Sequence, residues 1–130
     1  MKTVYYSLIS LSLLSACAMP TKKMEVKEEP PKTTTDLKSE YATETDPEKK
    51  FYLLTDYVNQ YASKDIPAEE KKEIKAAAES LLKMAPKFKG TWNYGNAIHQ
   101  GNLVIGRVQL ADEKLKSAES YLLAASMTPG

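Results

Sequence analysis

Hydrophobic residues recur at helical spacing through the last two thirds of the chain. Three stretches repeat the same separation of three, four and three residues, which places the members of each stretch on one face of an α-helix. The stripes are Phe51, Leu54, Val58 and Tyr61, then Ile74, Ala77, Leu81 and Met84, and finally Leu115, Ala118, Leu122 and Ala125. The pattern predicts an all-α fold built from amphipathic helices.

Polar residues and prolines mark the ends of these helices. Asp46 can cap the free amides of a first turn, and Pro47 suits the first helical position because it has no amide hydrogen to satisfy. Pro86 stops the second helix, because proline removes a donor and clashes with the preceding turn. We expect four helices within a domain of residues 46–130, at about 47–63, 67–85, 92–110 and 114–126.

The third of these helices contains three glycines, Gly95, Gly101 and Gly106. Each costs about 1 kcal/mol relative to alanine inside a helix, so their presence needs a reason. Close packing of a neighbouring helix supplies one, and predicts that the third and fourth helices meet at Gly106 and Ala118. A loop around Gly95 is the alternative at that position.

The N-terminus follows another pattern. After Lys2, an apolar run from Val4 to Leu14 is 11 residues long, which is too short for a membrane span of about 20 residues but fits a secretory signal. The run ends in Leu14-Ser15-Ala16-Cys17, which resembles the lipobox of bacterial lipoproteins. That resemblance implies removal of residues 1–16 and attachment of lipid, with palmitate among its acyl chains, to Cys17.

Two other interpretations of this segment stay open. Signal peptidase could cut after Ala16-Cys17-Ala18, with Cys17 a small hydrophobic residue, or the segment could remain as an uncleaved anchor. If Cys17 carries two or three acyl chains, the protein stays on the membrane essentially permanently. Ala18 in place of aspartate implies the periplasmic side of the outer membrane in a Gram-negative cell envelope.

Residues 17–45 join this anchor to the domain. They are rich in Lys, Glu, Thr and Pro, and such a composition buries too little apolar surface to fold. We expect a disordered linker, which serves either as a spacer or simply as a tail.

Charge and cysteine content exclude several functions. The chain has 18 basic and 17 acidic residues, so no field of one sign favours nucleic acid. One His and one Cys at unrelated positions supply no metal site, and no cofactor motif is present. No nucleophile, acid or base is placed as an enzyme requires, so we expect no catalytic residue and no enzyme.

The hairpin of residues 96–127 resembles a tetratricopeptide repeat, a pair of antiparallel helices that pack through small residues. The matching positions are Ile105-Gly106, Ala118, Leu122, Ala125 and, one place early, Pro129. The sequence departs from the repeat at Asn102, Gln109 and Asp112-Glu113, where Trp, Tyr and a glycine-containing turn are common. Arrays of such repeats usually need about three copies, so we expect dependence on further residues or on a partner.

Five residues of this region are candidates for binding a protein partner. Trp92 and Tyr94 could form an aromatic patch, or could pack in the core. Asn96 and His99 could hydrogen-bond a ligand, and Arg107 could grip a carboxylate of a partner or of a neighbouring Asp or Glu. The sequence therefore predicts a lipid-anchored adaptor that binds another protein at the cell envelope. The alternative is a purely structural envelope lipoprotein without a specific groove.

Overall fold

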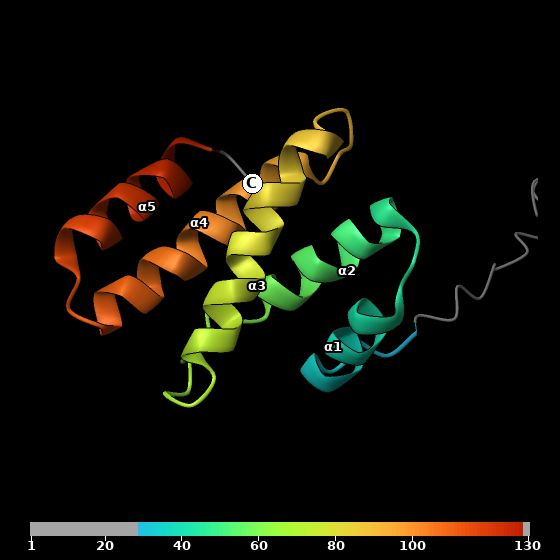
Figure 1. The fold of residues 1–130 in the computed structure, drawn as a ribbon, viewed down its shortest axis with the longest axis horizontal. Coiled ribbons are helices and arrows are strands. Elements are labelled where there is room, and N and C mark those ends of the chain that lie inside the picture. Colours follow the sequence, from blue (N-terminus) through green and yellow to red (C-terminus); the bar gives the residue numbers. More distant parts are fainter. Residues whose placement is uncertain (1–28, 129–130) are drawn as a thin grey trace, which may run out of the picture. The chain divides into compact units, whose positions relative to one another are not determined.

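The computed structural model describes residues 29–128, and this part of the chain contains helices and no strand (Figure 1). Its elements are α1 (Thr34–Thr43), α2 (Pro47–Asn59), α3 (Lys71–Met84), the 3-10 helix η1 (Ala85–Phe88), α4 (Tyr94–Ala111) and α5 (Leu115–Met127). The all-α prediction is confirmed. The predicted signal peptide and the lipid attachment site at Cys17 lie outside the described residues.

The four predicted helices are present with shifted ends. α2 begins at Pro47 as expected, and Asp46 Oδ1 accepts the Lys49 amide at 2.8 Å. It ends at Asn59 rather than Ser63, because the next amides bond to carbonyls only three residues back, which tightens the backbone into turns. α3 begins at Lys71, several residues after the expected start, because the amides of residues 70 and 71 both bond the Pro67 carbonyl in a turn.

α1 corrects the predicted boundary between linker and domain. We expected residues 17–45 to be disordered, but residues 34–43 form a helix with a reciprocal cap. Thr33 Oγ1 accepts the Asp36 amide at 3.3 Å, and Asp36 Oδ2 accepts the Thr33 amide at 3.1 Å. Leu37, only 3% exposed, then joins the core. The ordered domain therefore begins about twelve residues earlier than residue 46, where the sequence placed it.

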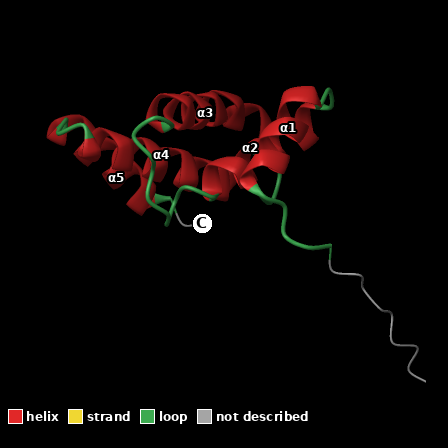
Figure 2. Cartoon of the chain, turned by 90° about the horizontal axis from the view of Figure 1, so that it is seen from below, coloured by secondary structure: helices red, strands yellow, loops and turns green. Residues whose placement is uncertain are grey.

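α4 lies at the centre of the domain. It packs against α2, α3 and α5, whereas α1 packs mainly on α2 (Figures 1 and 2). The fully buried side chains come from α2, α3 and α4, and the largest are Phe51, Leu54, Ile74, Leu81 and Ile105. Each buried side chain of this size contributes about 1.5 to 3 kcal/mol. The first two stripes therefore meet α4 in one core, whereas the third stripe lies outside this cluster and its Leu115 is exposed.

Two glycines of α4 mark close contacts with neighbouring helices. A Cβ at Gly101 would lie 2.7 Å from Leu82 Cδ2 of α3, and one at Gly106 would lie 2.7 Å from Leu122 Cδ2 of α5. The predicted contact of the last two helices at Gly106 is confirmed. Gly95 lies inside α4, so the loop suggested as an alternative at that position is wrong.

The turn between α4 and α5 contains a strained residue. Glu113 has φ 60°, the left-handed region that disfavours side chains with a Cβ. We expect Glu113→Gly to raise the free energy of unfolding by about 1 kcal/mol, because glycine adopts this conformation without a steric cost. Urea unfolding measures the change.

Asp112 supplies the matched control for this prediction. It is the adjacent residue, at φ −92°, so Asp112→Gly relieves no strain and should destabilise the domain. Equal effects of the two substitutions would contradict the argument.

Candidate functional site

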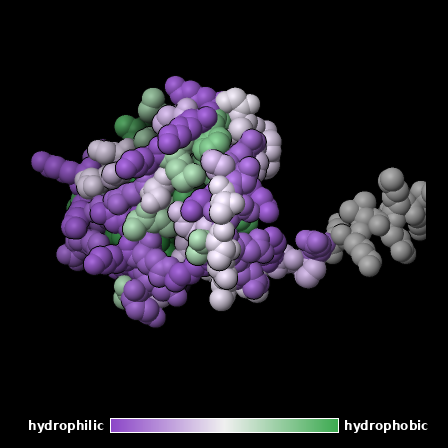
Figure 3. Space-filling model, turned by 45° about the vertical axis from the view of Figure 1, so that its right-hand side comes forward, coloured by the Kyte–Doolittle hydropathy of each residue, from purple (hydrophilic) through white to green (hydrophobic). Residues whose placement is uncertain are grey.

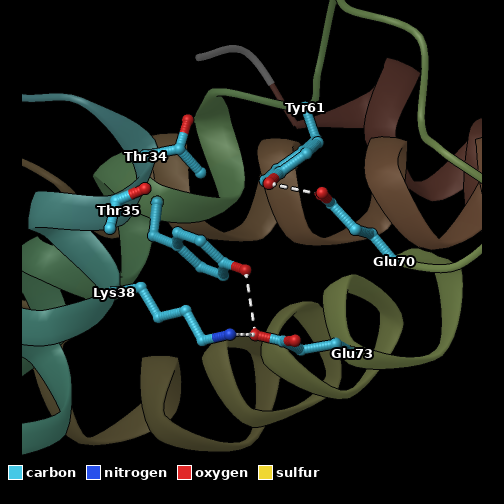
Figure 4. Close-up of a pocket in the computed structure, with 7 residues that line it drawn as sticks. Thr34, Thr35, Lys38, Tyr61, Glu70 and Glu73 are labelled. Carbon is cyan, nitrogen blue, oxygen red and sulfur yellow. Dashed lines mark hydrogen bonds and ion pairs between the residues drawn. The ribbon is translucent and has the colours of Figure 1, made fainter.

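The structure shows a hollow between α1 and α3, lined also by Tyr57 of α2 and by Tyr61, two residues after that helix. It encloses about 220 Å³ and is lined by Thr34, Thr35, Lys38, Tyr57, Tyr61, Glu70 and Glu73 (Figure 4). A second hollow of about 280 Å³ shares Lys38, Tyr57 and Glu73 with the first. Its other lining residues are Tyr41, Ala42, Ala76, Ala77 and Ser80. We refer to the two adjoining hollows together as the α1–α3 groove.

Three helices position the polar side chains of this groove. Tyr61, just after α2, donates its hydroxyl to Glu70 Oε2 at 2.9 Å, and Tyr57 of α2 donates to Glu73 Oε1 at 3.4 Å (Figure 4). Lys38 of α1 forms an ion pair with Glu73 of α3 across the groove. Both charged side chains of that pair are about half exposed, so it aligns the two helices more than it stabilises them.

The electrostatics of the groove fix its charge states at neutral pH. The hydrogen bond from Lys38 holds the pKa of Glu73 below its usual range, and the same contact raises the pKa of Lys38. Burial raises the pKa of both tyrosines further above neutrality. All four shifts move away from pH 7, so these groups suit fixed recognition of a ligand better than proton transfer.

The two halves of the groove differ in character. The first half holds hydroxyls and two carboxylates against one lysine, and therefore carries net negative charge. The second half is lined largely by alanines and by the rings of Tyr41 and Tyr57. Figure 3 shows hydrophobic residues reaching the surface among hydrophilic ones on one face of the molecule. Each half is smaller than the typical small-molecule pocket of about 300 to 1,000 Å³, and matches one or two side chains instead.

The predicted aromatic patch is only partly as expected. Trp92 is 80% exposed, so the core-packing interpretation is wrong for this residue. Its ring stacks on Tyr52 with centroids 5.9 Å apart. Tyr94 is half-buried and packs against the core, and Asn96 Nδ2 donates to Asn93 Oδ1 at 3.3 Å.

His99 and Arg107 make structural contacts with backbone carbonyls. His99 Nδ1 lies 2.9 Å from the Ala125 oxygen and 3.1 Å from the Thr128 oxygen. Carbonyls only accept hydrogen bonds, so this nitrogen carries the proton and ties α4 to the end of α5. Arg107 donates to the backbone carbonyl of Tyr61, just after α2, in place of the expected carboxylate.

The structure does not bring the five candidates into one site. Trp92 lies before α4, His99 contacts the end of α5, and Arg107 lines a different hollow beside Asp65 and Lys71. The α1–α3 groove contains none of the five. It was missed because its first wall is α1, although Thr33 and Asp36, followed by Leu37 and Tyr41 one turn apart, carried a signal for that helix.

Residues 29–128 contain neither a candidate metal site nor a candidate membrane span. No group of three or more His, Cys, Asp or Glu side chains there could hold a metal ion. Within the same range, no helix has both the length and the apolar character needed to cross a membrane. Comparison of the chain with family models, with curated proteins and with solved structures finds no match.

Proposed function

We propose that this protein is a lipid-anchored adaptor of the bacterial cell envelope, which binds a segment of another protein in the α1–α3 groove. The observation that carries the proposal is the groove itself, with an acidic half and an alanine-lined half side by side. The anchor is the lipidated Cys17 that the lipobox resemblance implies, on the periplasmic side of the outer membrane.

The lining of the groove indicates the chemistry of its occupant. Glu70 accepts a hydrogen bond from Tyr61, whereas Glu73 has Lys38 as its cation. A lysine or arginine of a partner can therefore place its charge at Glu70, with partial desolvation to strengthen the contact. Ala76 and Ala77 leave room for small apolar side chains of the same segment. The expected partner is an exposed protein segment with a basic residue next to small apolar ones.

The packing of the hairpins supports the tetratricopeptide-like interpretation. In a stack of helical hairpins, the first helix of one hairpin contacts both helices of the preceding one. Here α4 contacts both α2 and α3 and then pairs with α5. We propose that α2–α3 and α4–α5 are two degenerate repeats, and that the groove is formed where α1 flanks the first.

A photo-crosslinking amino acid at Ala76 tests this function in living cells. Ala76 is exposed and lines the groove, so a bound segment lies within reach of the probe. We expect one discrete adduct with an envelope protein. Adding Glu70→Lys should reduce its yield at least tenfold, because the new lysine repels the basic residue of the partner.

Matched variants separate groove binding from general effects. Glu69 is the exposed neighbour of Glu70 and does not line the groove, so Glu69→Lys should leave the adduct unchanged. A probe at Lys116, exposed on α5, should give no such adduct. If Ala76 and Lys116 give the same adducts, or if Glu70→Lys has no effect, binding in the groove is disproved.

A further inference from the structure

The connection between α3 and α4 exposes the only tryptophan of the chain. Trp92 is 80% exposed, whereas the aromatic rings of Phe51, Tyr57 and Tyr61 are buried. Tryptophan combines a large apolar ring with a polar N–H, which suits a boundary between an apolar and an aqueous region. Tyr52 covers one side of the ring by stacking, and the rest faces solvent.

A ring contact and two hydrogen bonds hold this connection in a turn. Phe88 stacks on the buried Phe51 with ring centroids 4.6 Å apart, which fixes the end of η1 on the core. The Thr91 hydroxyl donates to the Phe88 carbonyl at 2.8 Å, and the Thr91 amide donates to the same oxygen at 3.0 Å. Lys87 and Lys89, on either side of Phe88, are both exposed.

The charged residues that neighbour Trp92 in the sequence are all basic. Residues 80–111 contain no Asp or Glu, and Lys83, Lys87 and Lys89 lie just before the tryptophan. Among the ion pairs of the described residues, none involves these three lysines. The carboxylate linked to this region is Glu48, which accepts the Tyr52 hydroxyl at 2.6 Å. We name the segment that carries the four exposed residues Lys83, Lys87, Lys89 and Trp92 the Trp92 turn.

We propose that the Trp92 turn docks the domain on a bilayer surface that contains anionic lipids. Tryptophan prefers the boundary between headgroups and acyl chains, and lysines beside it pair with lipid phosphates. This inference rests on the lipid anchor of the proposed function, which holds the domain close to a bilayer. About 14 residues separate Cys17 from Pro31, and a chain of that length spans up to about 50 Å.

The position of the turn fits this docking. α1 and α2 run in opposite directions along one another, so Pro31 and Lys32 lie beside Asn59 and Gln60 at the end of α2. Trp92 contacts Tyr52, about two helical turns back along α2, a distance of about 10 Å. The chain between anchor and domain is long enough for the Trp92 turn to reach the membrane without unfolding α1.

Fluorescence of the single tryptophan measures the docking directly. The mature lipidated protein is reconstituted into vesicles of phosphatidylcholine alone, or of phosphatidylcholine with about a third phosphatidylglycerol, each with a spin-labelled lipid that quenches nearby indoles. We expect at least half of the Trp92 emission to be lost in the anionic vesicles and little in the zwitterionic ones. Salt should restore the emission, because it screens the lysines.

Lysine variants decide whether the turn itself is responsible. Lys87→Gln with Lys89→Gln should weaken docking about 25-fold, or about fivefold for each lysine near the surface. The control is Lys72→Gln with Lys116→Gln, two exposed lysines elsewhere, which should leave quenching unchanged.

Three outcomes would overturn the inference. Protein that floats with both vesicles but shows no lipid quenching has an anchor and no docking surface. Quenching that is equal in both lipids, or insensitive to the Lys87 and Lys89 changes, removes the role of the turn. Protein that fails to float with either vesicle lacks the anchor. That result also overturns the membrane anchoring in the proposed function.

Discussion

Gly106→Leu is expected to destabilise the domain by about 3 kcal/mol or more, close to the upper end of overpacking effects. Even a Cβ at this position would lie 2.7 Å from Leu122 Cδ2 and 3.2 Å from the Leu122 backbone nitrogen. A leucine adds three more carbons to that contact, so the Leu122 side chain and the adjoining backbone of α5 must shift. A domain of this size has a total stability of roughly 5 to 10 kcal/mol, so the loss is a large share of it.

Thermal and urea unfolding of the chain after residue 17 measure this loss. Ala118→Leu, at a position only 2% exposed on the facing helix, should show a similar effect. Glu119→Leu is the control, because Glu119 is exposed and the change should stay within about 0.5 kcal/mol. A Gly106→Leu protein that melts at the wild-type temperature would show that α4 and α5 are not in close contact in solution.

Cys17→Ala is expected to remove the lipid-modified form almost completely. The thiol of Cys17 is the group to which the lipid would be attached, and alanine has none. Wild-type protein should sediment with membranes and resist extraction by salt, because each buried methylene of its acyl chains contributes about 0.8 kcal/mol. The variant should accumulate as unprocessed precursor or as soluble protein, which immunoblotting of cell fractions detects.

Ser15→Ala is the control for this experiment, since it keeps a small residue in the lipobox and should be processed normally. Mass spectrometry gives the decisive result on the wild type. A mature N-terminus at Met19, or an unmodified thiol at Cys17, would disprove the lipoprotein interpretation.

The helices were predictable from sequence because burial and spacing act locally. The stripes that begin at Phe51, Ile74 and Leu115 lie mostly in α2, α3 and α5. The first two stripes enter the core, whereas Leu115 is 66% exposed. Their ends were less predictable. The strong start signal at Asp65 and Pro67 produced a turn before α3, because hydrogen bonds to one carbonyl compete with the first turn of a helix.

The candidate site was largely unpredictable, because it depends on tertiary packing. α1 has a weak apolar stripe and becomes stable by burying Leu37 against α2, which local composition does not report. Without α1 there is no groove. Arg107 and His99 carried the right donors, but the sequence could not show that backbone carbonyls at the ends of other helices lie within reach.

α1 buries little of its surface against the rest of the domain, and this affects its response to force. Leu37 is the only residue of this helix that is buried, so its detachment costs far less than unfolding of the domain. Detachment removes one wall of the groove, and the apparent affinity for a partner falls in proportion to the fraction of molecules with α1 in place. α1 is the first helix of residues 29–128, so tension on the proposed anchor at Cys17 would reach it before the other helices described. We expect the groove to bind the proposed partner when the anchor bears no tension, and to release it when tension detaches α1.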